Sequence, residues 1–461
     1  MLDATADSYT LAWTHGDSLD SHAVLYRINS LSKKQDRRPH SPPGSQMTYA
    51  GIQLNPTNLL RRIEELASLN TAPEDSYHPL QIGDELDNAR YRVIDKLGYG
   101  GYSTIWLARD FRKARYVAVK VITADASLIT SLGNTLSRSG KGFIPPLIDE
   151  FWIAGPNGKH KCIVTPPALM SLFDAKEAST FGLFRPKVAQ SIVAQLIHGV
   201  AFLYSEHIVY DGNILVQFPK AIDHLSTSEL YEKFRKPEPE AIVRLDGKPF
   251  TNGVPTQFGV RSEDIDFSER IILSDFGESF NPHISPKFSS KTLPLLQPPE
   301  ARFSDEPLSF ASDIWSLACT IWEIAGYRPL FEAFFPTADR SEVLGILPPE
   351  WWEKWSRRLD WFNEEGELNL KPGISARRAL GQRFEYSIQE PRAETGLETM
   401  TGEERRAIKV MLRSMLVYRP DKRATAQQVL HSEWMKDWGQ PALEQSRSTS
   451  MNIDPSYKPD T

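Results

Sequence analysis

The spacing of hydrophobic residues changes near residue 169, and the change predicts two kinds of structure along the chain. Before that point, short runs of β-branched and aromatic residues alternate with turns that contain glycine or charge, a pattern typical of an antiparallel sheet. Three of these runs read RYRVIDKL, TIWLARD and RYVAVKVI, and two more flank the turn Gly155–Lys159. We therefore expect a small β lobe over residues 76–168.

Beyond residue 169, apolar residues recur every three or four positions, which is the spacing of one face of a helix. One such series begins after Pro186, a residue type that suits the first position of a helix. Residues 311–324 and 403–416 show the same spacing. A larger helical lobe is thus predicted over residues 169–437, and the fold class is α+β with two lobes.

Three stretches depart from these patterns. Residues 1–75 are predicted to form a mostly disordered extension, apart from a short helix within 56–69 that is either a docking helix or a marginal surface helix. Residues 218–268 are rich in proline and charge, which indicates an insertion between two strands. Residues 438–461 lose their apolar periodicity, so we expect a loose C-terminal tail.

Composition narrows the class of protein. The net charge of −6 gives no electrostatic reason to expect direct nucleic-acid or membrane partners. The two cysteines, Cys162 and Cys319, are too far apart for a metal motif, and their small number fits a reducing compartment. The first residues lack the features of a secretory signal, and polar residues interrupt the apolar stretches 191–203 and 314–335. We expect a soluble protein of the cytoplasm, the nucleus or both.

The first chemical signal is the glycine-rich run GYGGYS, from Gly98 to Ser103, between two predicted strands. Closely spaced glycines allow a backbone to approach a phosphate without obstruction by side chains. On its own, such a run is more often a plain hairpin turn. The next strand ends in VAVK, and Lys120 at its end is a cation that could hold phosphate as a point charge. A lone lysine in that position is usually just solvated.

Motifs later in the chain favour a phosphate-binding role for the glycine-rich run and for Lys120. Asp275-Phe276-Gly277 follows an apolar run, so a carboxylate is expected at the end of a buried strand. Mg²⁺ prefers carboxylate and phosphate oxygens, which makes Asp275 a natural metal ligand. The motifs Pro298-Pro299-Glu300 and SDIWS at 312–316 follow in order, and Arg423 comes last. Each motif alone has an ordinary structural explanation, but their joint order and spacing indicate a protein kinase.

As a set, these motifs resemble those of the SR-protein kinases (serine/arginine-protein kinases), particularly the fungal members. The run LGYGGYSTIWL from Leu97 is similar to their glycine loop, in which Ser replaces the third glycine. The run DFGE from Asp275 and the Pro-Pro-Glu ending are similar too, and the insertion 218–268 lies where these kinases carry a spacer. The resemblance covers residues 75–437. It implies a bilobal protein-kinase fold, transfer of the ATP γ-phosphate to Ser or Thr hydroxyls with Mg²⁺, and Arg/Ser-rich splicing factors as protein substrates.

The resemblance also implies an ATP site between the lobes. The glycine loop would cover the phosphates, and Lys120 would anchor the α- and β-phosphates. Thr165 would be the gatekeeper residue, with the Pro166 carbonyl and the Ala168 N–H as contacts of the adenine. The implied ATP-binding residues are Leu97, Gly98, Gly100, Ser103, Ile105, Ala118, Lys120, Thr165 and Ala168.

Further roles follow from the same resemblance. Asn213 and Asp275 would hold Mg²⁺. Pro298-Pro299-Glu300 would close the activation segment, and Glu300 and Arg423 would form a buried ion pair that supports it. Asp313 would brace the catalytic loop through backbone amides.

The catalytic loop departs from the family pattern. Phosphoryl transfer in kinases conventionally uses Asp-x-x-x-x-Asn. Here the run HIVYDGNILV places Asp211 only two residues before Asn213, and Tyr210 stands where a His is expected. Asp211 is therefore either the catalytic base or a loop residue that remains after the true base was lost. No Arg precedes Asp211, so we expect activity without phosphorylation of the activation loop.

The regulatory helix is the second departure. A kinase pairs its strand lysine with a Glu on that helix, but the only acidic residue between Lys120 and Ile144 is Asp125, which is too close to the strand. Two explanations remain open for these gaps. The chain is either a pseudokinase or nucleotide-binding scaffold that holds partners, or a translation from which short coding pieces are missing.

Overall fold

The computed structural model describes most of the two predicted lobes, and every described residue lies in the compact unit Pro56–Thr461. The extension 1–75, most of the insertion, the stretch 125–141 expected to hold a regulatory helix, and Asp211 lie outside the described residues. The described residues are 77–100, 102–124, 142–156, 158–179, 181–210, 212–217, 222–234, 236–239, 257–258, 270–331, 336–367 and 379–453.

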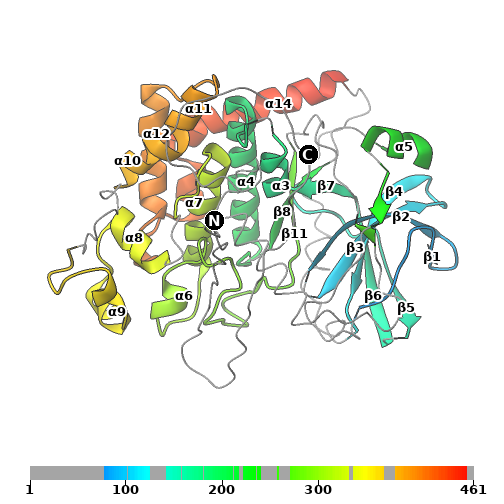
Figure 1. The fold of residues 1–461 in the computed structure, drawn as a ribbon, viewed down its shortest axis with the longest axis horizontal. Coiled ribbons are helices and arrows are strands. Elements are labelled where there is room, and N and C mark those ends of the chain that lie inside the picture. Colours follow the sequence, from blue (N-terminus) through cyan, green and yellow to red (C-terminus); the bar gives the residue numbers. More distant parts are fainter. Residues whose placement is uncertain are drawn as a thin grey trace, which may run out of the picture. The chain divides into compact units, whose positions relative to one another are not determined.

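An antiparallel sheet of six strands forms the β lobe, in the order β1-β2-β3-β4-β6-β5 (Figure 1). Its strands are β1 (Glu85–Leu86), β2 (Tyr91–Gly100), β3 (Ser103–Asp110), β4 (Arg115–Ile122), β5 (Asp149–Gly155) and β6 (Gly158–Thr165). Successive side chains point to opposite faces of a strand, so each strand contributes side chains to both faces of the sheet. One face buries residues such as Val93, Trp106 and Val119 in the lobe's core, and the other face carries Lys120.

A second sheet starts the helical lobe and holds the two predicted metal ligands near one edge. Its strands lie in the order β11-β8-β7 and comprise β7 (Ala168–Ser171), β8 (Asn213–Gln217) and β11 (Ile271–Ser274). The pairing of β8 with β11 is antiparallel and places Asn213 opposite Ser274. Asp275 directly follows Ser274, so the chain brings Asn213 and Asp275 to the same end of two adjacent strands.

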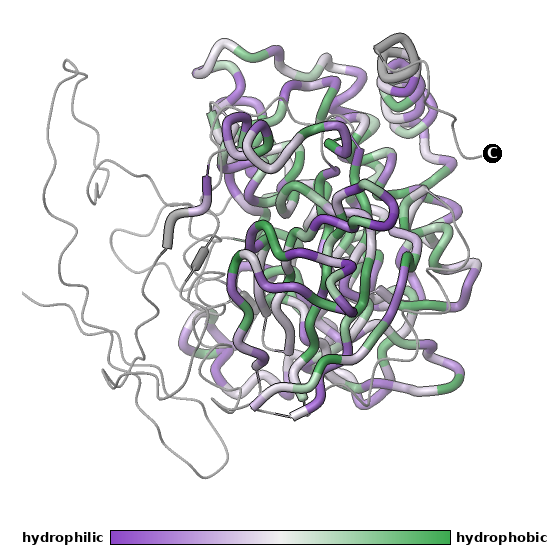
Figure 2. Tube along the Cα trace, turned by 90° about the vertical axis from the view of Figure 1, so that its right-hand side faces the viewer, coloured by the Kyte–Doolittle hydropathy of each residue, from purple (hydrophilic) through white to green (hydrophobic). Residues whose placement is uncertain are grey.

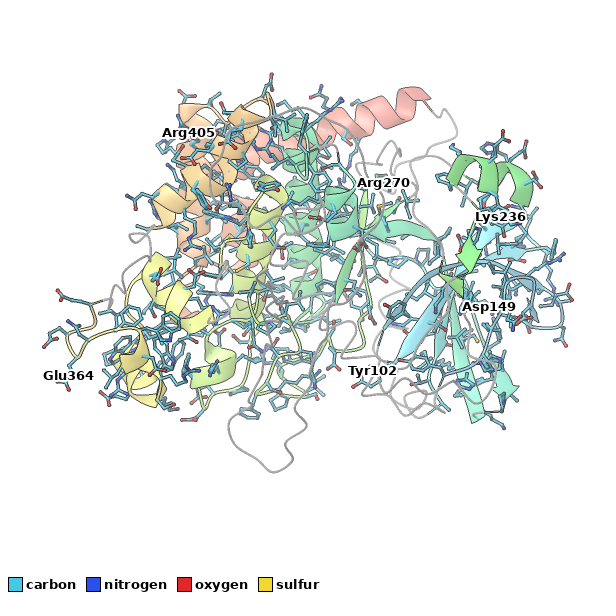
Figure 3. All side chains as sticks on the ribbon, viewed as in Figure 1. Tyr102, Asp149, Lys236, Arg270, Glu364 and Arg405 are labelled. Carbon is cyan, nitrogen blue, oxygen red and sulfur yellow. The ribbon has the colours of Figure 1, made fainter. Side chains whose placement is uncertain are left out.

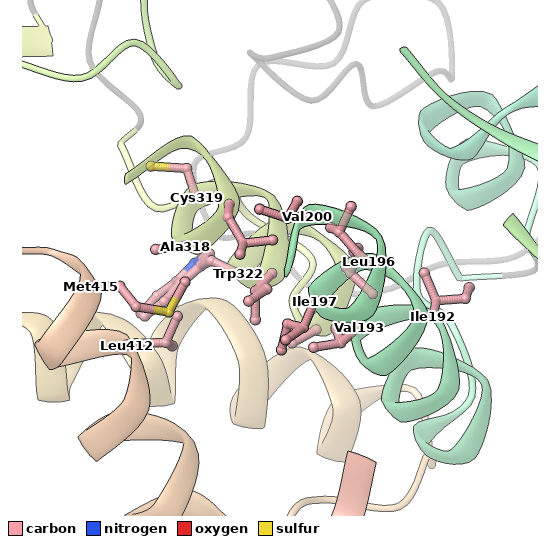
Figure 4. Packing of buried hydrophobic residues seen from close by; sticks show 14 of the residues in the cluster. Ile192, Val193, Leu196, Ile197, Val200, Ala318, Cys319, Trp322, Leu412 and Met415 are labelled. Atoms are coloured by element: carbon pink, nitrogen blue, oxygen red, sulfur yellow. The ribbon is translucent and has the colours of Figure 1, made fainter. Parts of the chain in front are cut away.

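The core of the helical lobe surrounds α4 (Pro186–Ser205), as the periodicity after Pro186 predicted. Figure 4 shows α4 side chains packed against those of α7 (Phe310–Ala325) and α12 (Gly402–Met415). Among the described helices, α4 alone is long and apolar enough to cross a membrane, but 78% of its most apolar window is buried within the protein, as expected of a core helix.

Shorter helices complete this lobe. Apolar and polar positions interchange along their trace, as the hydropathy colouring in Figure 2 shows, because each helix buries only one side. The remaining α-helices of the lobe are α3 (Leu172–Glu177), α6 (Glu300–Phe303), α8 (Pro336–Leu344), α9 (Pro349–Lys354), α10 (Leu380–Phe384), α11 (Glu390–Glu394), α13 (Ala426–Leu430) and α14 (Gln440–Ile453).

The expectation of a loose tail over 438–461 is wrong for its first part. Residues 440–453 form α14, in which Ala442 and Leu443 are buried. The side chain of Gln440 also hydrogen-bonds His198 of α4 at 2.9 Å. Two adjacent apolar residues are too few to produce a periodic pattern, but they suffice to anchor the helix on α4. Residues 454–461 lie outside the described part.

Part of the insertion folds back onto the β lobe. Residues 222–234, which we call the strap, contain α5 (Thr227–Phe234). Tyr231 Oη donates to the carbonyl of Ile94 at 2.6 Å, and the backbone N–H of Tyr116 donates to Asp223 Oδ1 at 2.7 Å. The apolar contacts join Ile222 and Leu230 of the strap to Ile94, Leu107 and Tyr116 of the sheet.

The position of the strap matters for the site. Leu107 pairs with Ala118, and Ile105 pairs with Lys120, so these four side chains share one face of the sheet. Because Leu107 also packs against the strap, the strap covers part of the face that carries Lys120. The small strands β9 (Glu238–Pro239) and β10 (Gln257–Phe258) form a separate pair in the same insertion.

Candidate functional site

The glycine loop is the hairpin between β2 and β3, and it encloses open space. Gly98 pairs with Ile105, and Gly100 pairs with Ser103. A Cβ atom at either Gly98 or Gly100 would meet no atom within 4 Å, so the backbone there is accessible to a ligand. Tyr102 extends from the end of the hairpin and is 61% exposed (Figure 3). Such a loop can lie over an anion without a side chain in between.

Lys120 and Asp275 form the ion pair at the centre of the site. Their atoms Nζ and Oδ1 are 2.5 Å apart, although 155 residues separate them in sequence. The contact joins β4 of one lobe to the end of β11 in the other. The nearby Lys120 charge lowers the pKa of the Asp275 carboxyl, so this group is ionised at neutral pH. The site therefore presents a lysine cation paired with an ionised carboxylate, a group of the type that binds Mg²⁺.

The backbone at Asp275 has an unusual conformation. Its φ is +59°, in the left-handed region that residues other than glycine rarely adopt. Such strained residues cluster at functional sites, where the surrounding structure holds them in place. Here the strain turns the chain sharply after β11, and the carboxylate meets Lys120 across the two lobes.

Two protein groups fit a magnesium ion at this place. Asp275 offers carboxylate oxygens and Asn213 offers an amide oxygen, both of the hard oxygen type that Mg²⁺ prefers. Both side chains are exposed. Among the described residues no three His, Cys, Asp or Glu side chains gather into a metal site. Mg²⁺ is usually bound by one or two protein groups together with substrate phosphates, so this pair fits a metal that arrives with phosphate oxygens.

Tyr210 connects these two residues through the backbone. Its hydroxyl lies 2.7 Å from the Asn213 carbonyl oxygen and 2.8 Å from the Ser274 carbonyl oxygen, and the Ser274 N–H donates to it at 3.1 Å. Its ring packs on Phe276 with 5.3 Å between centroids. The Tyr210 backbone N–H donates to Asp313 Oδ2 at 2.6 Å, as the bracing role of Asp313 requires.

The shortened catalytic loop leaves little space around it. A Cβ atom at Gly212 would lie 2.5 Å from the Ser274 carbonyl oxygen and 2.6 Å from that of Asp275. Only glycine fits so close to another backbone. The loop therefore runs directly against the strand end that carries Asp275. The neighbouring Asp211, the expected base, lies outside the described residues, so its role stays a prediction.

The structure brings Glu300 and Arg423 together. Both guanidinium Nη atoms lie 2.6 Å from the Glu300 carboxylate, and both side chains are buried. Arg423 Nη1 also donates to the Ala311 carbonyl, and Ser312 Oγ donates to Glu300. This bidentate pair fixes the end of the activation segment to α7.

Sequence reasoning missed Arg340, which holds the same segment from the other side. Its Nη2 atom donates to the carbonyl oxygens of Pro294 and Gln297, each at 2.7 Å. The guanidinium lies near the Trp315 and Phe331 rings, and burial lowers its pKa to about 10. A buried arginine whose acceptors are distant carbonyls leaves no local pattern in a sequence.

The remaining predicted ATP contacts lie on strands β2, β4, β6 and β7. Ala118 is buried beside Thr165, its partner in the β4–β6 ladder, and Ala168 begins β7. Leu97 packs against the strap cluster. Of the predicted ATP-binding set, Ile105, Ala118 and Lys120 share a face of the sheet, and the individual roles stay predictions.

Comparisons with known proteins give relatives of one type. No family model matches the chain. A serine/threonine protein kinase of Aspergillus fumigatus is 24% identical over 383 residues, which cover 78% of this chain and 87% of the relative. The serine/threonine-protein kinase SRPK of Physarum polycephalum is 24% identical over 405 residues, or 78% of this chain and 89% of the relative. SRSF protein kinase 3 of Homo sapiens is 33% identical over 141 residues, or 28% of this chain and 25% of the relative.

The fold is also that of a solved kinase domain. A crystal structure of a kinase domain superposes with a TM-score of 0.53 at 16% identity, and the match covers 79% of this chain and 100% of that chain. The bilobal α+β kinase fold predicted from the sequence is thus confirmed. The predicted resemblance to serine/threonine protein kinases, SR-protein kinases among them, is confirmed by the relatives' names.

Proposed function

We propose that this chain is a protein kinase that transfers the γ-phosphate of ATP to Ser or Thr hydroxyls of proteins. One observation carries the proposal: Lys120 and Asp275 meet at 2.5 Å beside an open glycine loop, with Asn213 at the end of the adjacent strand. The pair combines a phosphate-binding cation with a metal-binding carboxylate in one place. Its kinase relatives support the same activity.

The chain's own groups have distinct tasks in this reaction. ATP supplies the phosphoryl group, and Mg²⁺ neutralises charge on its phosphates. Lys120 holds the phosphates as a point charge, and the glycine loop covers them with backbone. Asp275 and Asn213 hold the metal. Asp211 accepts the proton of the substrate hydroxyl.

Arg/Ser-rich proteins linked to mRNA splicing are the proposed substrates. The support is the names of relatives such as SRPK and SRSF protein kinase 3, together with a net charge of −6 that suits a basic partner. Such a kinase would act in the cytoplasm, the nucleus or both. The test is a panel of Arg-Ser, Lys-Ser and Arg-Ala repeat peptides with Mg-ATP. Phosphorylation of the Arg-Ser peptide alone supports this class, and equal use of Lys-Ser peptide contradicts it.

A second candidate function is a nucleotide-binding scaffold. The close approach of Gly212 to the backbone at Asp275 favours it, because so short a loop has little room to present a base and a metal ligand together. A thermal-shift measurement with Mg-ATP, paired with a phosphate-transfer assay, separates the two functions. A stabilising shift without transfer supports the scaffold, whereas a shift with transfer supports the kinase.

A further inference from the structure

The glycine loop is open on the side that faces a nucleotide. Gly98 and its partner Ile105 belong to the face of the sheet that carries Lys120, and Gly100 lies two positions further along the same face. A Cβ atom at either glycine would meet no atom of the described chain within 4 Å. The support of this loop must therefore come from somewhere other than the nucleotide side.

Tyr77 binds the tip of the loop from the core side of the sheet. Its hydroxyl donates to the Gly100 carbonyl oxygen at 2.8 Å. Tyr77 belongs to residues 77–80, which we call the flank and which precede the first strand of the β lobe. Leu80 of the flank is 2% exposed and packs in the same core cluster as Trp106. A segment outside the nucleotide site thus reaches the tip of the glycine loop.

His78 fixes the flank next to Tyr77. Its ring centroid lies 5.0 Å from that of His160 on β6, and His160 is fully buried. His78 also fills the space beside Gly155 of β5, where no larger side chain would fit. The Nδ1 atom of His160 lies 3.0 Å from the carbonyl oxygen of Ile122, at the end of β4. The flank is therefore attached to the same end of the sheet as the glycine loop.

The glycine loop needs such an attachment because its backbone is otherwise hard to fix. Glycine has more conformational freedom than any other residue, so ordering it costs more entropy. A tip that is already fixed before a nucleotide arrives lowers this cost of binding. A loop that covers phosphates must also open before product leaves, and such opening steps limit the turnover of many enzymes. The hydrogen bond of Tyr77 therefore acts on both affinity and release.

We propose that Tyr77 is a positioning residue that holds the glycine loop over the phosphates, so that the flank controls how fast nucleotide leaves the site. The inference rests on the proposed function, because it places the phosphates of ATP or ADP under the loop. Tyr77 itself does not contact the nucleotide in this account. Its effect is specific to phosphates, because the hydroxyl acts on the tip of the loop, whereas the predicted adenine contact Ala168 lies on β7.

The experiment compares Tyr77→Phe with Tyr418→Phe in the full chain. Tyr77→Phe keeps the ring and removes the hydroxyl alone. Tyr418 is the matched control, because its hydroxyl also bonds a backbone carbonyl, that of Gly345 at 2.9 Å, in the helical lobe. Release of a fluorescent ADP analogue is followed after a chase with unlabelled Mg-ADP. Calorimetry measures the affinities for Mg-ADP and for adenosine, which has no phosphate.

Tyr77→Phe should release nucleotide about fivefold faster and bind Mg-ADP about fivefold more weakly, the effect of one lost hydrogen bond of typical net strength. Its affinity for adenosine should stay unchanged, because the loop covers only the phosphates. Tyr418→Phe should match the wild type in every readout. An unchanged release rate in Tyr77→Phe, an equal rise in both variants, or equal losses of affinity for ADP and adenosine overturns the inference.

A double-mutant cycle tests the part of the flank. His78→Ala loosens the flank without a change in the loop, so it should also speed the release of nucleotide. Combined with Tyr77→Phe it should add little, because the hydroxyl through which the flank acts is already absent. Additive effects of the two substitutions would contradict a route through Tyr77.

The outcomes also separate this inference from the proposed function. A wild-type chain that binds Mg-ADP but transfers no phosphate contradicts the kinase proposal alone, and the release rates still decide the role of Tyr77. Phosphate transfer by the wild type with unchanged release from Tyr77→Phe contradicts the inference alone. A wild-type chain that binds no Mg-ADP contradicts both.

Discussion

At the scale of single residues, Lys120 and Asp275 set the electrostatics of the site. The Lys120 side chain is 27% exposed and that of Asp275 is 43% exposed, so solvent screens their attraction. The pair therefore adds little to the free energy of unfolding, and its main role is in the chemistry of the site. Asp275 stays ionised because Lys120 depresses its pKa, and an ionised carboxylate is the form that binds Mg²⁺.

Lys120→Met should abolish most phosphate transfer. The variant removes the cation that holds the phosphates, so we expect a loss of about 100-fold or more in kcat/KM, the scale of lost transition-state electrostatics. The labelled-phosphate assay measures it. Lys159→Met, at an exposed lysine of β6, is the control and should keep full activity. Comparable losses in both variants would mean that Lys120 has no special role.

The Glu300–Arg423 pair illustrates the opposite case, in which burial makes a charge pair structural. Arg423→Met leaves the Glu300 carboxylate buried without its cation, and we expect the free energy of unfolding to fall by about 3–5 kcal/mol. Urea denaturation measures the change. Arg357→Met breaks the exposed pair with Asp360 and should cost at most about 1 kcal/mol. Equal effects of the two variants would contradict the buried role of Arg423.

At the scale of elements, the strap links the insertion to the nucleotide face of the sheet. Its Leu230 is 3% exposed and packs with Leu107, whose face also carries Lys120. Deletion of this contact should therefore affect both stability and nucleotide binding. The position of the strap depends on tertiary packing and could not be predicted from its charged sequence.

Leu230→Ala should lower the free energy of unfolding by about 2–3 kcal/mol, as truncation of a buried leucine does. It should also weaken Mg-ATP binding, because the strap supports the sheet beside the site. Denaturation and calorimetric titration measure the two effects. Leu359→Ala, at a half-exposed leucine, is the control and should change neither by a measurable amount. Unaltered nucleotide affinity in Leu230→Ala would contradict the link between strap and site.

Elements with strong local periodicity were predictable from the sequence. The strands β2, β3 and β4 and the helix α4 lie close to their expected bounds, because alternation and helical spacing depend on neighbouring residues alone. The strap and α14 were not predicted. Each is anchored by a few apolar residues whose partners lie far away in the chain.

The site, too, combines features that are visible in the local sequence with contacts between distant residues that are not. The motif positions of Lys120 and Asp275 were visible, yet their contact joins residues 155 positions apart and followed only from the resemblance. Arg340 left no signal, because its partners are backbone carbonyls of another segment. The hydroxyl bonds of Tyr210 were equally invisible, since a sequence does not show which atoms a shortened loop brings together.

At the scale of the whole molecule, ion pairs and hydrogen bonds from distant parts of the chain hold the activation segment. Glu300–Arg423 fixes its end, Arg340 binds two of its carbonyls, and Lys287 donates to Glu278 at its start. In other kinases, ordering of this segment comes from pairs between arginines and a phosphorylated residue. The segment is thus ordered by the chain's own groups.

Activity should therefore survive treatment with a phosphatase. We expect the same rate of transfer before and after dephosphorylation, with mass spectrometry to verify that the activation segment carries no phosphate. A loss of activity after treatment, restored by incubation with Mg-ATP, would contradict this view of the segment.

The central claim is that this site transfers phosphate despite its short catalytic loop. The most direct measurement is transfer of labelled γ-phosphate from Mg-ATP to an Arg-Ser repeat peptide by the wild-type chain and by Asp275→Ala. We predict Mg²⁺-dependent transfer by the wild type and none by the variant, because the variant lacks the carboxylate that binds the metal. Absence of transfer by well-folded wild-type protein, or equal transfer by Asp275→Ala, would contradict the account.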